Sequence, residues 1–329
     1  MARQLLSVLG ADPKATDVGK VLLDDAQLRA LYETLTLTRV VDATCARLHA
    51  EGRIGFFVPS APAAAVSAGV AIALHDGDWL FPSFRDAGAY LARGGRIDDF
   101  LAQMLSAPSD PLGGRQLPGH GSLPDGRFVA PSGVAGAQVQ HAAGVAMAMQ
   151  LRGAANIAVA IFGPSAVEQG AFHTGLNAAV RHGVPAVFVC RSLGSESPTV
   201  LQRGAGYGVE TQLVDGGDCL AVANAVEAAR ALALDGGGAT IIEAVVDQVD
   251  DTQDAAGRLR AFVEYRGLWD AEREEAFLRR CHDRVLDALE AIDADEATPP
   301  SAALFDDVWA ERPWMLQEQA SRLEEPDHE

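Results

Sequence analysis

Residues 156–177 read NIAVAIFGPSAVEQGAFHTGLN, and this stretch decides the fold class. The apolar run that ends at Phe162 predicts a buried strand, Gly163 a turn, and the residues from about Ser165 onward a helix. Short apolar strands that lead directly into helices are typical of parallel α/β sheets. Because ligands bind at the carboxyl ends of such strands, we expect a ligand site directly after Phe162.

The same alternation of strand and helix continues outward from this stretch in both directions. It predicts a doubly wound, mostly parallel α/β sheet followed by a helical C-terminal region. Asp24 and Asp25 are suited to cap a long first helix. The expected helices are 26–50, 63–74, a pair within 86–105, 137–151, 165–182 and 219–234, and the expected strands are 79–81, 156–162, 186–190, 209–214 and 240–246.

Three regions follow from these patterns. Residues 1–24 are expected to form a loosely structured N-terminal arm, residues 25–290 the α/β domain, and residues 291–329 a C-terminal acidic tail. Within the domain, residues 106–132 are rich in Gly, Pro and Ser and have no periodicity. A loop of that length inside a compact domain is usually functional, so we expect it to be mobile, or collapsed into an empty site, when no ligand is bound.

The composition argues against several classes of protein. The chain has 329 residues, of which 48% are hydrophobic, and a formal net charge of −19, which disfavours binding to nucleic acid or to anionic membranes. The sequence contains no uncharged run of 18 apolar residues, so we expect no membrane-spanning helix. The apolar run near the N-terminus is too short for a secretory signal. Four scattered cysteines without a CxxC pair are typical of reduced thiols and predict a cytoplasmic location.

Seven short motifs are distinctive in combination. They are GRIGFF at 52–57, WLFPSFRD at 79–86, GRQLPGH at 114–120, GVAGAQV at 133–139, QGAFH at 169–173, PAVFVC at 185–190 and VDGGD at 214–218. In this order and spacing they resemble the alpha subunit of the first component of 2-oxo acid dehydrogenase complexes, most closely the branched-chain type. The resemblance covers roughly residues 25–290, which is most of the chain.

This resemblance implies a thiamine-diphosphate-binding fold. In the family, thiamine diphosphate and Mg²⁺ lie between an alpha chain and a beta-like subunit, and the complex decarboxylates a 2-oxo acid and transfers the acyl group to lipoamide. The expected assembly is therefore a heterotetramer with a beta-like subunit, or a homodimer. By position, the resemblance implies a catalytic role for His120 and cofactor contacts from Phe84, Arg85, Ala135, Gly136, Gln138, Gly163 and Ser165.

The positions that should hold the metal depart from the family pattern. Pro164 stands where the family has Asp in a Gly-Asp-Gly turn, and Leu193 stands where it has a metal-binding Asn. Neither side chain offers an oxygen, whereas Mg²⁺ requires a near-octahedral set of oxygen ligands. Ala87 and the stretch 251–253 also replace two histidines near the diphosphate. The sequence therefore predicts no metal site here and impaired or absent cofactor binding.

Two functions of different class remain open at this point. The chain is either an alpha-like enzyme subunit or a non-catalytic assembly partner of a beta-like chain; a repurposed pocket for another small molecule is a third possibility. Several residues also have simpler interpretations. His120 is equally well a solvent-exposed loop residue, Arg85 a surface ion-pair partner, His173 a packing residue, and the acidic run 247–254 a solvated loop rather than a metal site.

Overall fold

The computed structural model describes residues 5–10, 12–193, 199–246, 255–295, 301–306 and 309–324. In this part of the chain a five-stranded sheet has the order β1-β2-β3-β5-β4, and every pair of neighbouring strands is parallel. The predicted doubly wound parallel α/β fold is confirmed. The strands are β1 (Trp79–Phe81), β2 (Ala158–Phe162), β3 (Ala186–Leu193), β4 (Glu210–Asp215) and β5 (Thr240–Val246).

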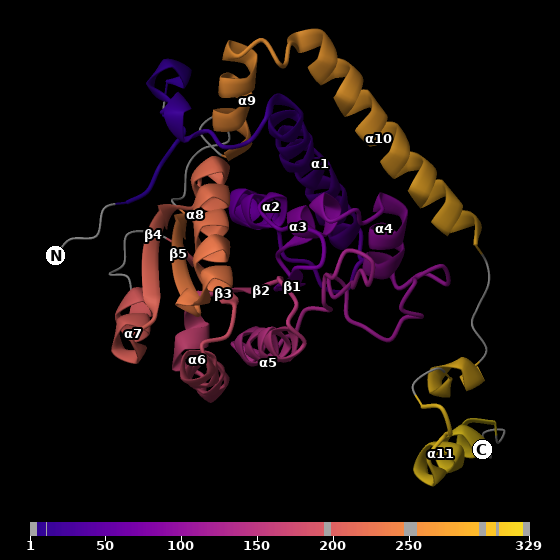
Figure 1. Ribbon diagram of the computed structural model, residues 1–329. Helices are drawn as coiled ribbons and strands as arrows, with labels where there is room; N and C mark the ends of the chain where they lie inside the picture. The colour runs from indigo at the N-terminus through magenta and orange to yellow at the C-terminus, as the bar shows by residue number, and fades with distance from the viewer. Residues whose placement is uncertain are drawn as a thin grey trace.

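Helices cover both faces of the sheet, which explains why its central strands are apolar throughout (Figure 1). Val159 and Ile161 of β2 point into a core shared with α2 and α8, whereas Phe162 points into a second core shared with α5 and α6. All five residues of β2 are buried. The helices of these two layers are α2 (Ala64–Ile72), α5 (Ala137–Leu151), α6 (Gly170–His182), α7 (Thr199–Tyr207) and α8 (Cys219–Leu232).

Helices α1, α3, α4, α9 and α10 form a third layer on the side of α2, whereas α11 lies apart from it (Figure 1). Helix α1 (Asp25–Ala50) begins with the expected cap, because Asp24 accepts hydrogen bonds from the backbone of Ala26 and Gln27. A third apolar cluster joins α1 to α4 and α10. The other helices are α3 (Ala87–Ala92), α4 (Ile97–Leu105), α9 (Ala255–Tyr265), α10 (Ala271–Ala294) and α11 (Trp314–Glu324), and the short 3-10 helices are Pro13–Ala15, Val18–Lys20, Ala61–Ala63, Pro164–Glu168 and Ser301–Phe305.

Two local predictions need correction. The helix expected from about Ser165 is divided into a 3-10 helix, Pro164–Glu168, and α6, which begins at Gly170. Proline at the first position favours such a turn because its φ is preset and it has no N–H to leave unpaired. Strand β3 also continues to Leu193, and α7 follows it without having been predicted.

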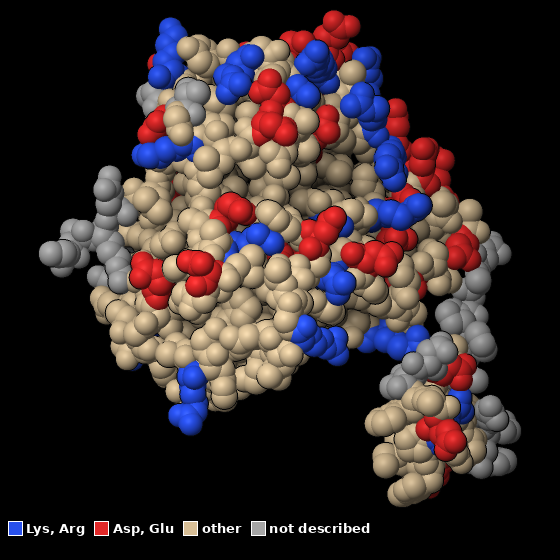
Figure 2. All heavy atoms as spheres, in the orientation of Figure 1, with Lys and Arg blue, Asp and Glu red and all other residues tan. Residues whose placement is uncertain are grey.

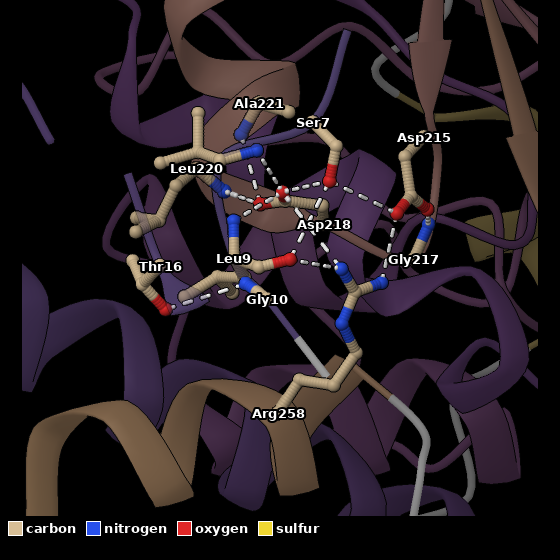
Figure 3. A network of polar contacts seen from close by, with 11 residues as sticks. Ser7, Leu9, Gly10, Thr16, Asp215, Gly217, Asp218, Leu220, Ala221 and Arg258 are labelled. Carbon is tan, nitrogen blue, oxygen red and sulfur yellow. Dashed lines mark hydrogen bonds and ion pairs between the residues drawn. The ribbon is translucent and has the colours of Figure 1, made fainter. Parts of the chain in front are cut away.

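The N-terminal arm is not loosely structured at residues 6–9. Leu6 pairs with the edge strand β4, and Val8 and Leu9 are buried. The carboxylate of Asp218 accepts hydrogen bonds from the backbone N–H groups of Val8 (2.5 Å) and Leu9 (2.7 Å), while its other oxygen caps α8 (Figure 3). The arm is ordered because this buried carboxylate satisfies donors on two separate segments.

The C-terminal residues also contain more structure than an acidic tail. Residues 301–305 form a 3-10 helix, and α11 follows it. The acidic runs at 247–254 and 325–329 lie outside the described residues. Within the described part of the chain, no helix is both long and apolar enough to cross a membrane.

Candidate functional site

The carboxyl ends of β1, β2 and β3 meet at one edge of the sheet because the three strands are parallel neighbours. Phe84 and Arg85 follow β1, Gly163 and Ser165 follow β2, and Arg191 lies near the end of β3. The structure therefore brings together predicted site residues that are about 80 positions apart in sequence. This edge is where a parallel α/β sheet normally holds its ligand.

Arg191 is the most constrained charged residue at this edge. Its side chain is 7% exposed; Nη1 donates to Asp86 Oδ1 at 2.8 Å, and Nη2 donates to Ser83 Oγ at 2.6 Å. Asp86 also accepts hydrogen bonds from the N–H and hydroxyl groups of Ser83. The positive charge of Arg191 is thus already balanced by a buried carboxylate, which would repel a bound anion.

Sequence reasoning assigned no role to Arg191. The sequence does contain a signal for Arg191, because it is a cation near the end of an otherwise apolar strand. A buried cation needs a partner of opposite charge. Neighbouring Ser192 donates to Glu243 Oε1 at 2.7 Å, whereas Oε2 of this buried carboxyl group has no hydrogen-bond partner in the described part of the chain.

Arg85 and Phe84 lie at the exposed side of the same edge. Arg85 is exposed, and its guanidinium makes no ion pair with the described residues; its Cζ atom lies 6.0 Å from the centre of the Phe84 ring. The opposite neighbour of Phe84 is His120, whose ring stacks on it with a centroid distance of 5.9 Å. Arg85 is therefore the available cation at this edge, and it is held by an aromatic ring rather than by a carboxylate.

His120, the predicted catalytic residue, is buried rather than solvent-exposed. Its Nδ1 lies 3.1 Å from the carbonyl oxygen of Pro118. A carbonyl oxygen only accepts hydrogen bonds, so this contact requires a proton on Nδ1. The structure thus places His120 beside Phe84.

The turn before α5 brings the predicted residues Ala135, Gly136 and Gln138 to this region. Gly136 has φ +81°, and an added Cβ would lie 3.3 Å from the backbone nitrogen of Phe172, so the turn favours glycine. Gln138 is buried, and its Oε1 has no hydrogen-bond partner among the described residues. An orphaned buried acceptor of this kind is suited to a ligand N–H group.

A magnesium–diphosphate group does not fit the residues at the ends of β2 and β3. Pro164 begins a 3-10 helix directly after Gly163, and Leu193 ends β3. Neither residue has a side-chain oxygen, and Ser165 supplies only an exposed neutral hydroxyl. The described residues contain no group of three or more His, Cys, Asp or Glu side chains that could hold a metal ion. Ser195 and the stretch 251–253 lie outside the described residues.

A small aromatic cavity lies beside the site. Phe56, Phe84 and Phe100 line it together with Asp42, and its volume of ≈ 10 Å³ leaves room for about one water molecule. Burial raises the pKa of Asp42 to about 6, although hydrogen bonds from the backbone of Ala61 and Ser60 oppose this shift. The cavity thus contains a carboxyl group whose pKa is raised to about 6.

His173 is a packing residue, as its simpler interpretation predicts. Its Nδ1 lies 2.9 Å from the hydroxyl of Tyr207 and its Nε2 lies 2.9 Å from the carbonyl oxygen of Val167. Both ring nitrogens are therefore occupied in joining α6 to α7 and to the turn after β2.

Comparisons with known proteins show the family of this chain. The dehydrogenase E1 component family matches residues 32–246. The chain is 30% identical to the alpha subunit of mitochondrial 2-oxoisovalerate dehydrogenase of Mus musculus, with 92% of this chain and 75% of the mouse protein aligned. It is 30% identical to the 2-oxoisovalerate dehydrogenase alpha subunit of Pseudomonas aeruginosa, with 98% of this chain and 88% of that protein aligned. The alpha subunit of the pyruvate dehydrogenase E1 component of Bacillus cereus is 29% identical, with 90% of this chain and 86% of that protein aligned.

Proposed function

Because this chain belongs to the dehydrogenase E1 component family, we propose that it is an alpha-type subunit whose own site does not support magnesium-dependent thiamine diphosphate chemistry. The relatives described above are named for 2-oxoisovalerate or for pyruvate. The proposed role is that of a non-catalytic assembly partner of a beta-like chain in a cytoplasmic heterotetramer. The four buried free cysteines support a reducing compartment.

One observation carries this proposal: Pro164 and Leu193, which have no side-chain oxygen, stand at the ends of β2 and β3, where the resemblance implies metal ligands. Losing two charge-assisted contacts, at about 1.5–3 kcal/mol each, weakens binding by roughly two to four orders of magnitude. Arg191 does not compensate, since Asp86 already neutralises it. Arg85 is one exposed cation and cannot replace a divalent ion that neutralises a diphosphate.

Calorimetry tests the proposal directly. Thiamine diphosphate is titrated into the chain and its partner, with and without MgCl₂, and we expect no magnesium-dependent heat. The matched variant is Pro164→Asp with Leu193→Asn, which restores two oxygen ligands; we expect it to bind Mg²⁺ weakly but not to decarboxylate 2-oxo acids. A magnesium-dependent dissociation constant at or below the micromolar range in the unaltered protein would show that the proposal is wrong.

A second function is favoured by Gln138. Its unpartnered Oε1, beside the glycine turn at Gly136, suits a heterocyclic ring with an N–H donor. This repurposed site would bind a nitrogen heterocycle that carries an N–H donor, without metal. Thiamine that binds equally well with and without Mg²⁺, and is lost in Gln138→Leu, would support this function over the first.

A further inference from the structure

A cleft of ≈ 450 Å³ lies between α1, α9 and α10, and we name it the interhelical cleft. Figure 1 shows α1 between the other two helices, and α1 packs against both of them. The volume is within the range of small-molecule sites in proteins, roughly 300–1,000 Å³. Within the described part of the chain, no residue that lines this cleft belongs to the candidate site at the carboxyl ends of the strands.

The charges around the interhelical cleft cancel. Its charged lining residues, among those that the structure describes, are Arg39 of α1, Arg260 and Glu264 of α9, and Glu274 of α10. Figure 2 shows acidic and basic side chains interspersed over α9 and α10, in contrast to the formal net charge of −19 for the whole chain. A ligand of one sign would be attracted by one pair of these side chains and repelled by the other, whereas a zwitterion complements both.

Two of these side chains keep hydrogen-bonding capacity that the described residues do not use. Arg260 donates from Nε to Glu264 Oε1 at 2.8 Å, and its Nη1 lies 3.6 Å from Glu274 Oε1. A guanidinium has five N–H donors, so most of them remain available to a carboxylate. Glu274 Oε2 accepts from the hydroxyl of Tyr32 at 2.9 Å and from Trp269 Nε1 at 2.7 Å, which fixes this carboxylate in place. Its Oε1 can therefore accept from an ammonium group.

Helix α1 contributes a buried hydroxyl to the interhelical cleft. Thr36 is 5% exposed, and its Oγ1 has no hydrogen-bond partner among the described residues, whereas Thr34, Thr38 and Thr44 donate to the carbonyl oxygen four residues earlier. Burial raises the pKa of Tyr32 to about 12 and the nearby Thr36 hydroxyl opposes this rise, but the two groups do not form a hydrogen bond of normal geometry. An unpaired buried hydroxyl costs free energy, which a ligand or water in the cleft recovers.

We propose that the interhelical cleft binds a zwitterionic small molecule, an α-amino acid with an apolar side chain. Its carboxylate pairs with Arg260, and its ammonium group pairs with Glu264 and Glu274, which both contact this arginine. Charge-assisted hydrogen bonds of this kind are roughly twice as strong as neutral ones. The side chain of the ligand covers the apolar wall, which consists of Val40, Ala261 and Leu278. This site goes beyond the proposed function, because it requires neither thiamine diphosphate nor a beta-like chain.

Calorimetry on the full-length chain tests the charge requirement, with L-phenylalanine as the probe. The two matched analogues are 3-phenylpropanoate, which lacks the ammonium group, and 2-phenylethylamine, which lacks the carboxylate. We expect L-phenylalanine to bind with a dissociation constant below about 1 mM and each analogue to bind at least about tenfold more weakly, because each loses a charge-assisted contact. L-Serine keeps both charges but has no apolar side chain, and it should also bind at least about tenfold more weakly.

Three variants locate the binding. Glu264→Gln should weaken L-phenylalanine at least about tenfold without weakening 3-phenylpropanoate, because only a partner of the ammonium group is lost. Ala261→Phe fills the cleft and should abolish binding of every probe. The matched control is Glu275→Gln, which breaks an ion pair of the same spacing with Arg279 on α10, outside the cleft, and should bind normally. Both glutamine variants should keep the melting temperature, since the two ion pairs are exposed.

Several outcomes would overturn the inference. One is a dissociation constant above about 1 mM for L-phenylalanine. Another is equal binding of either singly charged analogue, because the cleft would then not recognise a zwitterion. Unchanged binding of L-phenylalanine in Glu264→Gln, or in a folded Ala261→Phe, would place the amino acid elsewhere on the molecule.

Discussion

Buried carboxylates at the candidate site are stabilised in two different ways. Asp86 faces a full positive charge on Arg191, whereas Asp42 receives only the backbone N–H groups of Ser60 and Ala61. An ion pair keeps a buried carboxylate charged, while dipoles alone do so less completely. Substitution at these two positions should therefore change stability through different mechanisms: at Asp86 it removes the partner of a buried cation, and at Asp42 it removes a buried carboxyl group with a raised pKa.

Replacing Arg191 by methionine should strongly destabilise the protein. The substitution leaves Asp86 as an unpaired buried charge, which typically costs about 3–5 kcal/mol of unfolding free energy. Denaturant titration measures this loss, and the double variant with Asp86→Asn should recover part of it. The control is Arg203→Met, whose ion pair with Glu168 is exposed and is worth about 0–1 kcal/mol. A similar loss in both single variants would contradict the assignment of Arg191 as a buried partner.

The charge on Asp42 should make stability depend on pH between about pH 4 and pH 7. Burial raises its pKa from 3.8 to about 6, so the folded state binds the proton more tightly than the unfolded state. The stabilising contribution is therefore complete below pH 3.8 and is lost as the pH rises through about 6, a change of about 3 kcal/mol.

Asp42→Asn is the matched variant for this measurement. Its amide oxygen can still accept the hydrogen bonds of Ser60 and Ala61, but it does not titrate. The unfolding free energy of the unaltered protein, relative to the variant, should fall from acidic toward neutral pH. Parallel pH curves for the two proteins would argue against a raised pKa.

At the scale of elements, long-range side-chain contacts hold the segments that have no regular structure. Asp218 connects the N-terminal arm to α8, and Gln103 of α4 connects to the loop 106–132. In both cases one buried side chain satisfies backbone groups that no strand or helix pairs. These contacts, rather than local propensity, decide where the two segments lie.

Asp218→Asn should weaken the attachment of the N-terminal arm while α8 stays capped. The amide oxygen can still accept from Leu220 and Ala221, but the amide nitrogen then faces the N–H groups of Val8 and Leu9. Losing a charge-assisted hydrogen bond corresponds to about 2 kcal/mol, so the amides of Val8 and Leu9 should exchange about 30-fold faster. Asp12→Asn, at an exposed cap, serves as the control and should leave these amides unchanged.

The loop 106–132 should be weakly protected from hydrogen exchange except where side chains of the body hold it. Gln103 donates to the carbonyl oxygen of Leu117 at 2.7 Å and accepts from the N–H of Gly119 at 2.9 Å. Gln103→Leu should therefore accelerate exchange at Gly119, whereas the exposed Gln140→Leu should not. Full protection from hydrogen exchange across residues 112–128 without ligand would contradict the expectation that only a few side-chain contacts hold this loop.

At the scale of the whole molecule, the exposed apolar side chains of α11, Trp314 and Met315, predict that the chain does not act as a monomer. Light scattering at micromolar concentration should give at least twice the 34.5 kDa of one chain, either as a homodimer or together with a beta-like chain in a heterotetramer. A stable monomer, both alone and in the presence of that partner, would contradict this prediction.

The sequence by itself determined the fold class and most of the elements. Strand 156–162 and the helix after Asp24 were predictable because periodicity, apolar runs and capping residues act over a few neighbours. The absence of a side-chain oxygen at Pro164 and Leu193 was equally readable, since it depends on residue type alone. The division of the helix after Gly163 was not, because a 3-10 turn and an α-helix differ little in local preference.

Only the tertiary structure decided which distant residues meet. The pairing of Arg191 with Asp86, the anchoring of the arm by Asp218 and the stacking of His120 on Phe84 join positions from separate elements. Sequence motifs place these residues near strand ends or in loops, but partners depend on strand order and on how helices pack over the sheet. These partners are required for stability, because a charge or hydrogen-bond donor that is removed from water without a partner costs free energy. The tertiary structure alone decides which residue supplies that partner.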